Sequence, residues 1–199
     1  VCMSAKRFIV EKPIAQEFTE KFVARASALK VGNPLDAATV IGPLINRKQF
    51  DALDRQVTQA VAEGAQLLCG GHGDGLCYHP TVLGSVREDM AIFHEETFGP
   101  VAPIIVAEDA EDALRMANNS AYGLSAGIIT NNMQLGLALA RRIECGACHV
   151  NDSPLYGETH APLGGMNNSG WGKFGIEAMQ EFTEQRWVTL EMETRQYPF

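Results

Sequence analysis

The 199-residue sequence lacks a long apolar run, and no stretch approaches the ~18 residues that a membrane span requires. It also lacks a basic-then-apolar leader, so nothing in it marks secretion. Its 16 Lys and Arg residues against 24 Asp and Glu residues leave a net charge of -8. That charge argues against a nucleic-acid partner, because such binding depends on neutralising phosphates. We therefore expect neither a membrane nor a nucleic acid among the partners.

A disulfide framework is also missing, because the five cysteines are odd in number and irregularly spaced. This pattern fits a reducing compartment and predicts a cytoplasmic protein. Cys69, His72, Cys77 and His79 could form a zinc site, but interleaved glycines favour a flexible hairpin tip, so we expect no metal. Cys145-Gly146-Ala147-Cys148 is a bare C-x-x-C at a helix-to-strand turn. A redox motif would lie at a helix N-terminus, where the dipole lowers the thiol pKa, so an inert pair is favoured.

Strands alternate with helical patterns along the chain. The sequence predicts helices over residues 13–26, 47–63, 109–118, 133–143 and 176–183, and strands over 8–10, 66–68, 81–83, 101–106, 126–130, 149–151 and 187–190. This alternation indicates an α/β fold, an open and mostly parallel sheet with helices on both faces. Without an internal repeat or linker, residues 1–199 are expected to form one domain. The last strand either lies at the sheet edge or pairs outside its own sheet.

The first candidate site is the opening segment Val1-Cys2-Met3-Ser4-Ala5-Lys6-Arg7. A cysteine lies among small residues, two cations follow four and five positions later, and a β-branched run comes next. A thiol on a tight turn near positive charge is favoured as thiolate, so Cys2 is a candidate nucleophile. The alternative is that Cys2 is a small buried hydrophobe, as most cysteines are.

The second candidate site is His94-Glu95-Glu96-Thr97-Phe98-Gly99-Pro100. In an extended chain Glu96 and Phe98 project to the same side, where a carboxylate and a ring could hold a sugar diol and cover a flat heterocycle. The alternative is a solvated acidic turn with a core phenylalanine. Residues 170–175 match G-x-G-x-x-G but follow a loop by composition, so we expect backbone turns there rather than a phosphate site.

Taken together, these stretches resemble the aldehyde dehydrogenase superfamily. The matching pieces occur in the family's order and are residues 1–7, Gly32-Asn33-Pro34-Leu35-Asp36, Gly42-Pro43-Leu44, residues 95–100, Asn118, Tyr122-Gly123-Leu124, Val150-Asn151, Pro162-Leu163-Gly164-Gly165 and Ser169-Gly170. The resemblance implies the family's catalytic-domain fold with a C-terminal tail. It implies that Cys2 is the nucleophile, that Glu96 holds the nicotinamide ribose and that Phe98 contacts the nicotinamide.

The same resemblance implies an aldehyde substrate, NAD or NADP as cofactor, and a substrate entrance lined by residues 152–163. It also implies a homo-oligomer, dimer or tetramer, in the full-length protein. The family's dinucleotide-binding domain, general-base glutamate and oxyanion-hole asparagine precede the cysteine. We therefore expect this chain to be a piece of a longer polypeptide and to be inactive alone. Leu163 replaces the family's usual phenylalanine, and Asn167 its usual lysine.

Residues 169–175 and 181–187 look most like the aromatic-aldehyde branch, which comprises benzaldehyde, salicylaldehyde and vanillin dehydrogenases. The apolar side chains expected to contact a flat ring are Met3, Leu155, Tyr156 and Leu163. One rival hypothesis is a succinate-semialdehyde dehydrogenase, but it would need a cation for the distal carboxylate, and residues 152–163 contain no Arg or Lys. A second rival is a non-catalytic fragment that acts in assembly, and a third is a metal-binding module around Cys69.

Overall fold

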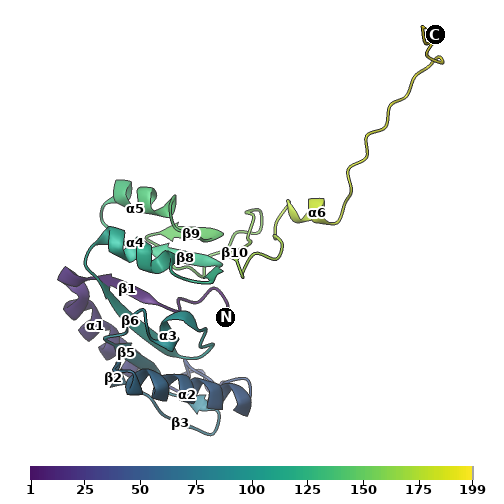
Figure 1. The fold of residues 1–199 in the computed structure, drawn as a ribbon. Coiled ribbons are helices and arrows are strands. Elements are labelled where there is room, and N and C mark those ends of the chain that lie inside the picture. The colour runs from purple at the N-terminus through teal and green to yellow at the C-terminus, as the bar shows by residue number, and fades with distance from the viewer. Residues whose placement is uncertain (199) are drawn as a thin grey trace.

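The computed structural model describes residues 1–198 and shows strands and helices that alternate along most of the chain (Figure 1). The described elements, in chain order, are β1 (Phe8–Glu11), α1 (Lys12–Ser27), α2 (Arg47–Ala62), β2 (Gln66–Cys69), β3 (Gly73–Asp74), β4 (Cys77–Tyr78), β5 (Thr81–Gly84), α3 (Ala91–His94), β6 (Val101–Ala107), α4 (Ala110–Asn118), β7 (Tyr122–Gly123), β8 (Ser125–Ile128), α5 (Met133–Ala140), β9 (Ala147–Val150), β10 (Met166–Asn167) and α6 (Ala178–Glu181).

The largest sheet has four strands in the order β1-β6-β5-β2. β1 and β5 both run parallel to β6, and only β2, at one edge, is antiparallel. β6 is a nearly continuous run of apolar residues, and all but two of its seven residues are buried. Such a run is typical of a central strand covered on both faces. The prediction of an open, mostly parallel sheet is confirmed.

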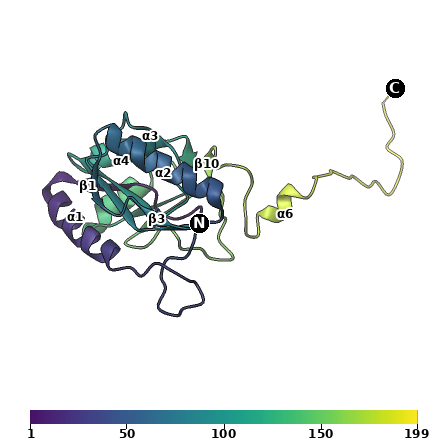
Figure 2. The same cartoon turned by 90° about the horizontal axis from the view of Figure 1, so that it is seen from below.

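Helices cover both faces of this sheet, as predicted. On one face α1 packs Phe18 and Phe22 against Val10 and Ile104. On the other face the core is formed by side chains of α2, α3 and the sheet, which are Phe50, Leu53, Val57, Ala60, Leu83, Ile92, Phe93, Val101 and Ile105. Figure 2 shows α1 and α2 on opposite sides of the strands. Alternation of side chains along β6 sends Ile104 to one layer and Ile105 to the other.

Side-chain caps begin three of the helices. Asn46 accepts a hydrogen bond from the Gln49 amide at 2.9 Å and starts α2. Asp109 does the same for α4, and Asn132 for α5. These residues satisfy N–H groups that have no partner within the helix, which is why the boundaries fall there.

A second, two-stranded parallel sheet follows the first along the chain. β8 pairs with β9 in a register that aligns Ser125 with Ala147 and Ile128 with Val150, and α5 packs on β9. β7 and β10 form a short antiparallel pair beside it. These elements lie next to α4, on the β1 side of the main sheet (Figure 1).

Residues 187–190 form no strand in the described chain, so the reading as an edge strand of this sheet is wrong, and pairing outside its own sheet stays a prediction. Between residues 182 and 198 the structure contains no helix or strand, and this segment extends away from the sheets (Figure 1). Trp187 is 91% exposed and Leu190 89% exposed. The apolar pattern matches a strand, but a strand needs an edge to pair with, and this segment reaches none in the described chain. The last helix, α6, is also shorter than predicted. None of the helices within residues 1–198 is long and apolar enough to cross a membrane.

Candidate active site

The opening segment forms a turn that presents Cys2 at the surface. The Ser4 amide donates to the Val1 carbonyl at 3.1 Å and closes the turn. Cys2 is exposed, whereas the other four cysteines are half-buried. The predicted turn is confirmed, and the alternative that Cys2 is a buried hydrophobe is wrong. A thiol in this position is open to an electrophile that approaches from solvent.

Arg7 anchors the end of this segment to the C-terminus of α4. Its guanidinium donates to the carbonyl oxygens of Met116 and Ala117, both at 2.8 Å, and to that of Asn119 at 3.3 Å. The guanidinium carbon also lies 4.8 Å from the centre of the Phe93 ring. A cation at a helix C-terminus is favourable because the last carbonyls have no partner within the helix. The charge of Arg7 therefore serves anchorage, a role that the sequence did not indicate.

Lys6 anchors the same segment to α3. Its ammonium group donates to the Phe93 carbonyl oxygen at 3.0 Å. Burial lowers the pKa of Lys6 to about 8, the neighbouring charge of Arg7 contributes to the decrease, and the carboxylates of Glu96 and Glu95 oppose it. Lys6 thus lies between the opening segment and the stretch that begins with Glu95. Through this side chain the opening segment is fastened to α3, the helix that leads into the second candidate site.

Two glutamines of α2 hold the stretch from Glu95 to Phe98. Gln49 donates to the Thr97 carbonyl at 2.8 Å, and Gln56 donates to the Glu96 carbonyl at 3.2 Å. Thr97 is 4% exposed, whereas Glu96 is exposed and Phe98 is 55% exposed. Glu96 and Phe98 are therefore both exposed on either side of a buried Thr97, although the backbone here is not the extended strand that the prediction assumed. The alternative of a core phenylalanine is wrong.

The backbone at Phe98 is strained. Its φ angle is 42°, in the left-handed region, which costs a residue with a side chain roughly 1–2 kcal/mol. The next residue, Gly99, passes so close to α2 that a Cβ there would lie 2.4 Å from the Leu53 side chain. The close packing and the two glutamine hydrogen bonds hold the strained conformation. Its effect is to direct an aromatic ring to the surface.

The predicted entrance loop encloses a cavity of about 180 Å³ against β9. The lining residues are Ala147, His149, Tyr156, Gly157, Glu158, Ala161, Pro162 and Leu163. Tyr156 packs edge-on against the His149 ring, with centroids 5.9 Å apart, and its hydroxyl donates to the Glu158 carboxylate. That bond raises the pKa of Tyr156.

Of the four predicted substrate contacts, the structure brings Tyr156 and Leu163 together in this cavity. Leu155 is exposed outside it. Met3 is half-buried, and its carbonyl lies 3.5 Å from the Ser125 hydroxyl at the start of β8. Ser125 aligns with Ala147 in the parallel register, so both side chains lie on the same face of the β8–β9 sheet. The cavity and the Cys2 turn therefore flank one face of this sheet.

His149 is a cavity residue that the sequence did not single out. Its Nε2 atom is buried and has no hydrogen-bond partner within residues 1–198. A buried polar atom without a partner is costly and is usually satisfied by water or a ligand. The signal available in the sequence was its place in a strand that leads directly into the entrance loop.

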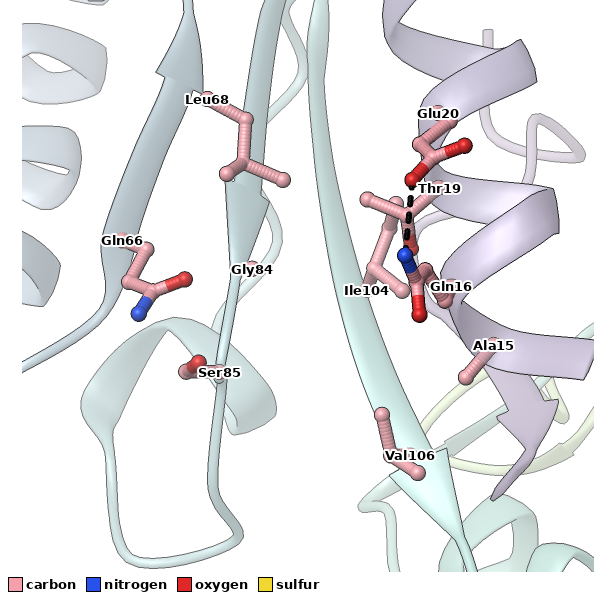
Figure 3. Close-up of a pocket in the computed structure, with 10 residues that line it drawn as sticks. All are labelled: Ala15, Gln16, Thr19, Glu20, Gln66, Leu68, Gly84, Ser85, Ile104 and Val106. Carbon is pink, nitrogen blue, oxygen red and sulfur yellow. Dashed lines mark hydrogen bonds between the residues drawn. The ribbon is translucent and has the colours of Figure 1, made fainter. Parts of the chain in front are cut away.

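A second cavity, of about 250 Å³, lies between α1 and the strands β2, β5 and β6 (Figure 3). Leu68, Ile104 and Ala15 supply apolar surface, and Gln16 donates to Glu20 at 3.0 Å along its rim. None of the predicted site residues lines it. This cavity marks a part of the sheet that α1 leaves uncovered and belongs to a different face from the candidate site.

The remaining motifs do not join this site. The Cys69 sulfur lies 3.6 Å from the Pro80 carbonyl, and the rings of His72 and His79 stack at 4.5 Å. Within residues 1–198 no three or more His, Cys, Asp or Glu residues form a group that could hold a metal ion. Gly172 and Gly175 have φ angles of 113° and 86°, which confirms the prediction that these glycines allow backbone turns.

Comparison with known proteins places this chain in a family. The sequence profile of the aldehyde dehydrogenase family matches residues 1–188. Benzaldehyde dehydrogenase [NAD(+)] of Pseudomonas putida is 42% identical over 201 aligned residues, which cover 100% of this chain and 41% of that protein. The chain therefore spans about two-fifths of the length of this relative.

Solved structures agree in fold. A salicylaldehyde dehydrogenase from Pseudomonas putida G7, complexed with salicylaldehyde, superposes with a TM-score of 0.95 at 38% identity, over 100% of this chain and 42% of that one. The glyceraldehyde-3-phosphate dehydrogenase GapN of Methanocaldococcus jannaschii, complexed with NADP, gives a TM-score of 0.87 at 40% identity, over 91% of this chain and 40% of that one. By its sequence and its α/β fold, the chain belongs to the aldehyde dehydrogenase family.

Proposed function

We propose that this chain supplies the nucleophile and the nicotinamide contacts for NAD(P)-dependent oxidation of an aromatic aldehyde to its carboxylic acid. The observation that carries the proposal is the hydrogen bond from Lys6 to Phe93, which fastens the segment of the exposed Cys2 turn to α3, the helix that leads into Glu96 and Phe98. Family membership and the aromatic-aldehyde relatives support it. In this reading Cys2 is the catalytic residue, and Glu96 and Phe98 bind the cofactor.

Cys2 begins the reaction as a thiolate that attacks the aldehyde carbon. The resulting oxyanion accepts a hydrogen bond from the Cys2 amide, which stabilises the charge as it develops. A bound NAD(P)⁺ would supply the acceptor for the hydride that leaves the thiohemiacetal carbon. Cys2 then carries a thioester, and water hydrolyses it to the acid and frees the thiol. Sulfur suits both steps because it is a strong nucleophile near neutral pH and a good leaving group.

The residues present fit the nicotinamide half of the cofactor. The Glu96 carboxylate is exposed and accepts no hydrogen bond from another side chain within residues 1–198, so its oxygens are available to ribose hydroxyls. The Phe98 ring, held outward by a strained backbone, offers a flat apolar surface beside it. NAD and NADP are each present in the names of relatives, and we propose one of the two as the cofactor.

An aromatic substrate suits the entrance side of the site. Tyr156 and Leu163 line the cavity on β9, and Met3 adjoins Cys2 in the sequence. The entrance loop contains no Arg or Lys, so a substrate with a distal carboxylate would find no cation there. Leu155 remains a proposed contact at the outer rim of the loop. These features favour a flat, uncharged aldehyde.

We further propose that residues 1–199 act as one catalytic unit with a C-terminal tail inside a cytoplasmic homo-oligomer. The tail exposes large apolar side chains such as Phe182 and Trp187, and apolar surface of this kind is usually covered in an assembly. Sedimentation of the protein carrying its cofactor-binding part tests this. A dimer or tetramer supports the proposal, and a monomer contradicts it.

The activity is tested with a chimera in which the part of the Pseudomonas putida benzaldehyde dehydrogenase not covered by this chain precedes Val1. We expect the chimera to form NADH from benzaldehyde and NAD⁺. Replacement of Cys2→Ser should abolish turnover while NADH still binds, as fluorescence reports. A Cys2→Ser chimera with undiminished turnover would rule out Cys2 as the nucleophile.

The 199-residue chain alone is expected to oxidise no aldehyde, because the cofactor domain and the general base lie outside it. Absorbance at the nicotinamide band, with benzaldehyde and either cofactor, measures this. Robust NAD(P)H formation by the chain alone would contradict the proposal that this chain needs a separate cofactor domain and general base.

A further inference from the structure

Two thiols meet at the turn between α5 and β9. Cys145 lies in the turn, and Cys148 is the second residue of β9. The Cys145 thiol donates to the Ala147 carbonyl oxygen at 3.1 Å, and its side chain also interacts with that of Cys148. Both cysteines are half-buried. The turn therefore brings the two side chains together and leaves part of each exposed to solvent.

The interaction between the two side chains makes the two thiols unequal. The interaction with Cys148 raises the pKa of Cys145, and burial raises it further. The same interaction lowers the pKa of Cys148, which accepts a hydrogen bond as thiolate. A thiolate is the reactive form of cysteine, so Cys148 is the more nucleophilic member and Cys145 is the proton-bearing one.

The pair is separate from the candidate active site. Ala147 and His149 line the cavity on one face of the β8–β9 sheet, and alternation places Cys148 on the opposite face. Val150 shares that opposite face, and it lies against α5, since a Cβ on Gly136 would come within 2.8 Å of a Val150 methyl group. The dithiol is thus on the α5 side of the sheet, away from the face that carries the cavity.

We propose that Cys145 and Cys148 form a modification site, a dithiol that a hydroperoxide oxidises to an intrachain disulfide. The Cys148 thiolate attacks one peroxide oxygen and breaks the O–O bond, which leaves a sulfenic acid and, after protonation, one water molecule. The Cys145 sulfur then attacks the Cys148 sulfur, forms the S–S bond and loses its proton as the hydroxyl leaves as a second water. The two sulfurs lose two electrons, and hydrogen peroxide is reduced to two molecules of water.

This assignment reverses the expectation of an inert pair. The sequence placed the motif away from a helix N-terminus, where a dipole would lower the thiol pKa. In the structure the hydrogen bond between the two side chains replaces that dipole as the source of the shift. The inference does not depend on the proposed dehydrogenase function, because it concerns a different face and different residues.

Oxidation at this turn has a structural consequence. Gly146 follows Cys145, and its backbone is packed so closely that a Cβ there would lie 1.4 Å from the Gly164 carbonyl oxygen. Gly164 directly follows the entrance loop. Movement of the turn on disulfide closure would therefore be transmitted to the end of that loop.

Peptide mapping of the 199-residue chain tests the proposal. The chain is treated with hydrogen peroxide, alkylated with iodoacetamide and digested with trypsin. The peptide over residues 143–173 contains Cys145 and Cys148 and no other cysteine, and the peptide over 56–87 contains Cys69 and Cys77. All four are half-buried, so the second peptide is a matched control.

We expect the 143–173 peptide to be lighter by two hydrogens and unalkylated, and to take up two alkyl groups only after dithiothreitol. The 56–87 peptide should be alkylated on both cysteines throughout. Oxidation of Met166 adds oxygen and is distinguished by mass. If both thiols of the 143–173 peptide remain alkylatable at a dose that oxidises Cys2, the proposal is overturned. Equal disulfide formation in the 56–87 peptide would overturn it as well.

Two substitutions assign the order of the steps. In Cys145→Ser, the sulfenic acid on Cys148 has no thiol to resolve it and should be trapped by dimedone. In Cys148→Ser, Cys145 should stay alkylatable and give no dimedone adduct. Dimedone labelling of Cys145 instead of Cys148 would contradict the assigned roles, and Cys69→Ser should leave the wild-type pattern unchanged. The wild-type mapping does not depend on the variants being folded.

Discussion

Both ends of the chain expose side chains to solvent, but hydrogen bonds to α3 and α4 hold the first in place. At the start, Cys2 is exposed, but Arg7 and Lys6 fasten the segment to α4 and α3 through four carbonyl oxygens. At the end, residues 182–198 expose Phe182 and Trp187 and contain no helix or strand. The difference shows that polar contacts to buried carbonyls can fix a segment whose reactive group stays open to solvent. Apolar side chains alone do not fix a segment that has no surface to pack on.

The largest effect should come from the residue on which both anchors converge. Phe93 is almost fully buried and contacts Arg7 as well as the core. Phe93→Ala should lower the free energy of unfolding by about 3–5 kcal/mol, because it leaves a cavity. Phe182→Ala, at a residue 89% exposed, should change it by less than about 0.5 kcal/mol. Urea unfolding followed by circular dichroism measures both, and equal effects would contradict the comparison.

The next effect concerns the contact between the β9 turn and the end of the entrance loop. Gly146→Ala would place a methyl group on the Gly164 carbonyl, and the backbone would have to shift. We expect a loss of about 1–3 kcal/mol in the free energy of unfolding. Gly157→Ala is the control, since nothing lies within 4 Å of a Cβ there. A neutral Gly146→Ala would show that the two backbones are not held in contact.

Arg7 should have a smaller but measurable effect. Arg7→Met keeps much of the apolar stem and leaves the carbonyls at the end of α4 without their donor, at a cost of about 1–2 kcal/mol. Arg186→Met removes an exposed cation from the tail and should be neutral. The same urea titration compares the two. If Arg7→Met is also neutral, the anchor does not hold the opening segment.

Lys6 should give the smallest effect, visible as a dependence of stability on pH. Its pKa is lowered from 10.5 to about 8 in the folded chain, so between these values the unfolded chain binds more protons. Stability therefore rises with pH across this window, because the cost of burying the charge disappears. We expect wild type to gain about 1 kcal/mol relative to Lys6→Met between pH 8 and 10, a figure reduced because the side chain is only half-buried. If the difference in the free energy of unfolding between wild type and Lys6→Met does not change with pH, the folded chain does not disfavour the charged form of Lys6.

Much of the fold follows from local pattern. The apolar run over residues 101–106 and the apolar spacing over residues 13–26 are readable along the chain, and the structure confirms the strand and the helix that they predict. The strand predicted over 187–190 does not pair with this chain's own sheet, because pairing depends on an available edge, which no local pattern encodes. The outward positions of Glu96 and Phe98 agree with the sequence prediction, but the Phe98 ring is directed outward by a left-handed backbone rather than by strand alternation.

The residues that hold the candidate site in place could not be predicted from the sequence. The bonds from Gln49 and Gln56 to the Thr97 stretch span 48 and 40 residues of sequence, and those of Arg7 span more than a hundred. Glutamine and arginine are ordinary surface residues of helices and strands, so nothing in their own neighbourhood distinguishes these. The buried Nε2 of His149 likewise becomes apparent only when β9 is placed beside the entrance loop.

The central claim, that Cys2 is the nucleophile, is tested most directly by a single turnover of the chimera with benzaldehyde and NAD⁺, quenched in acid and mapped by mass spectrometry. The account predicts a benzoyl group on the tryptic peptide that contains Cys2, removable by hydroxylamine as expected for a thioester. A benzoyl group on any other cysteine, or NADH formation at the chimera's full rate in the Cys2→Ser variant, would contradict it.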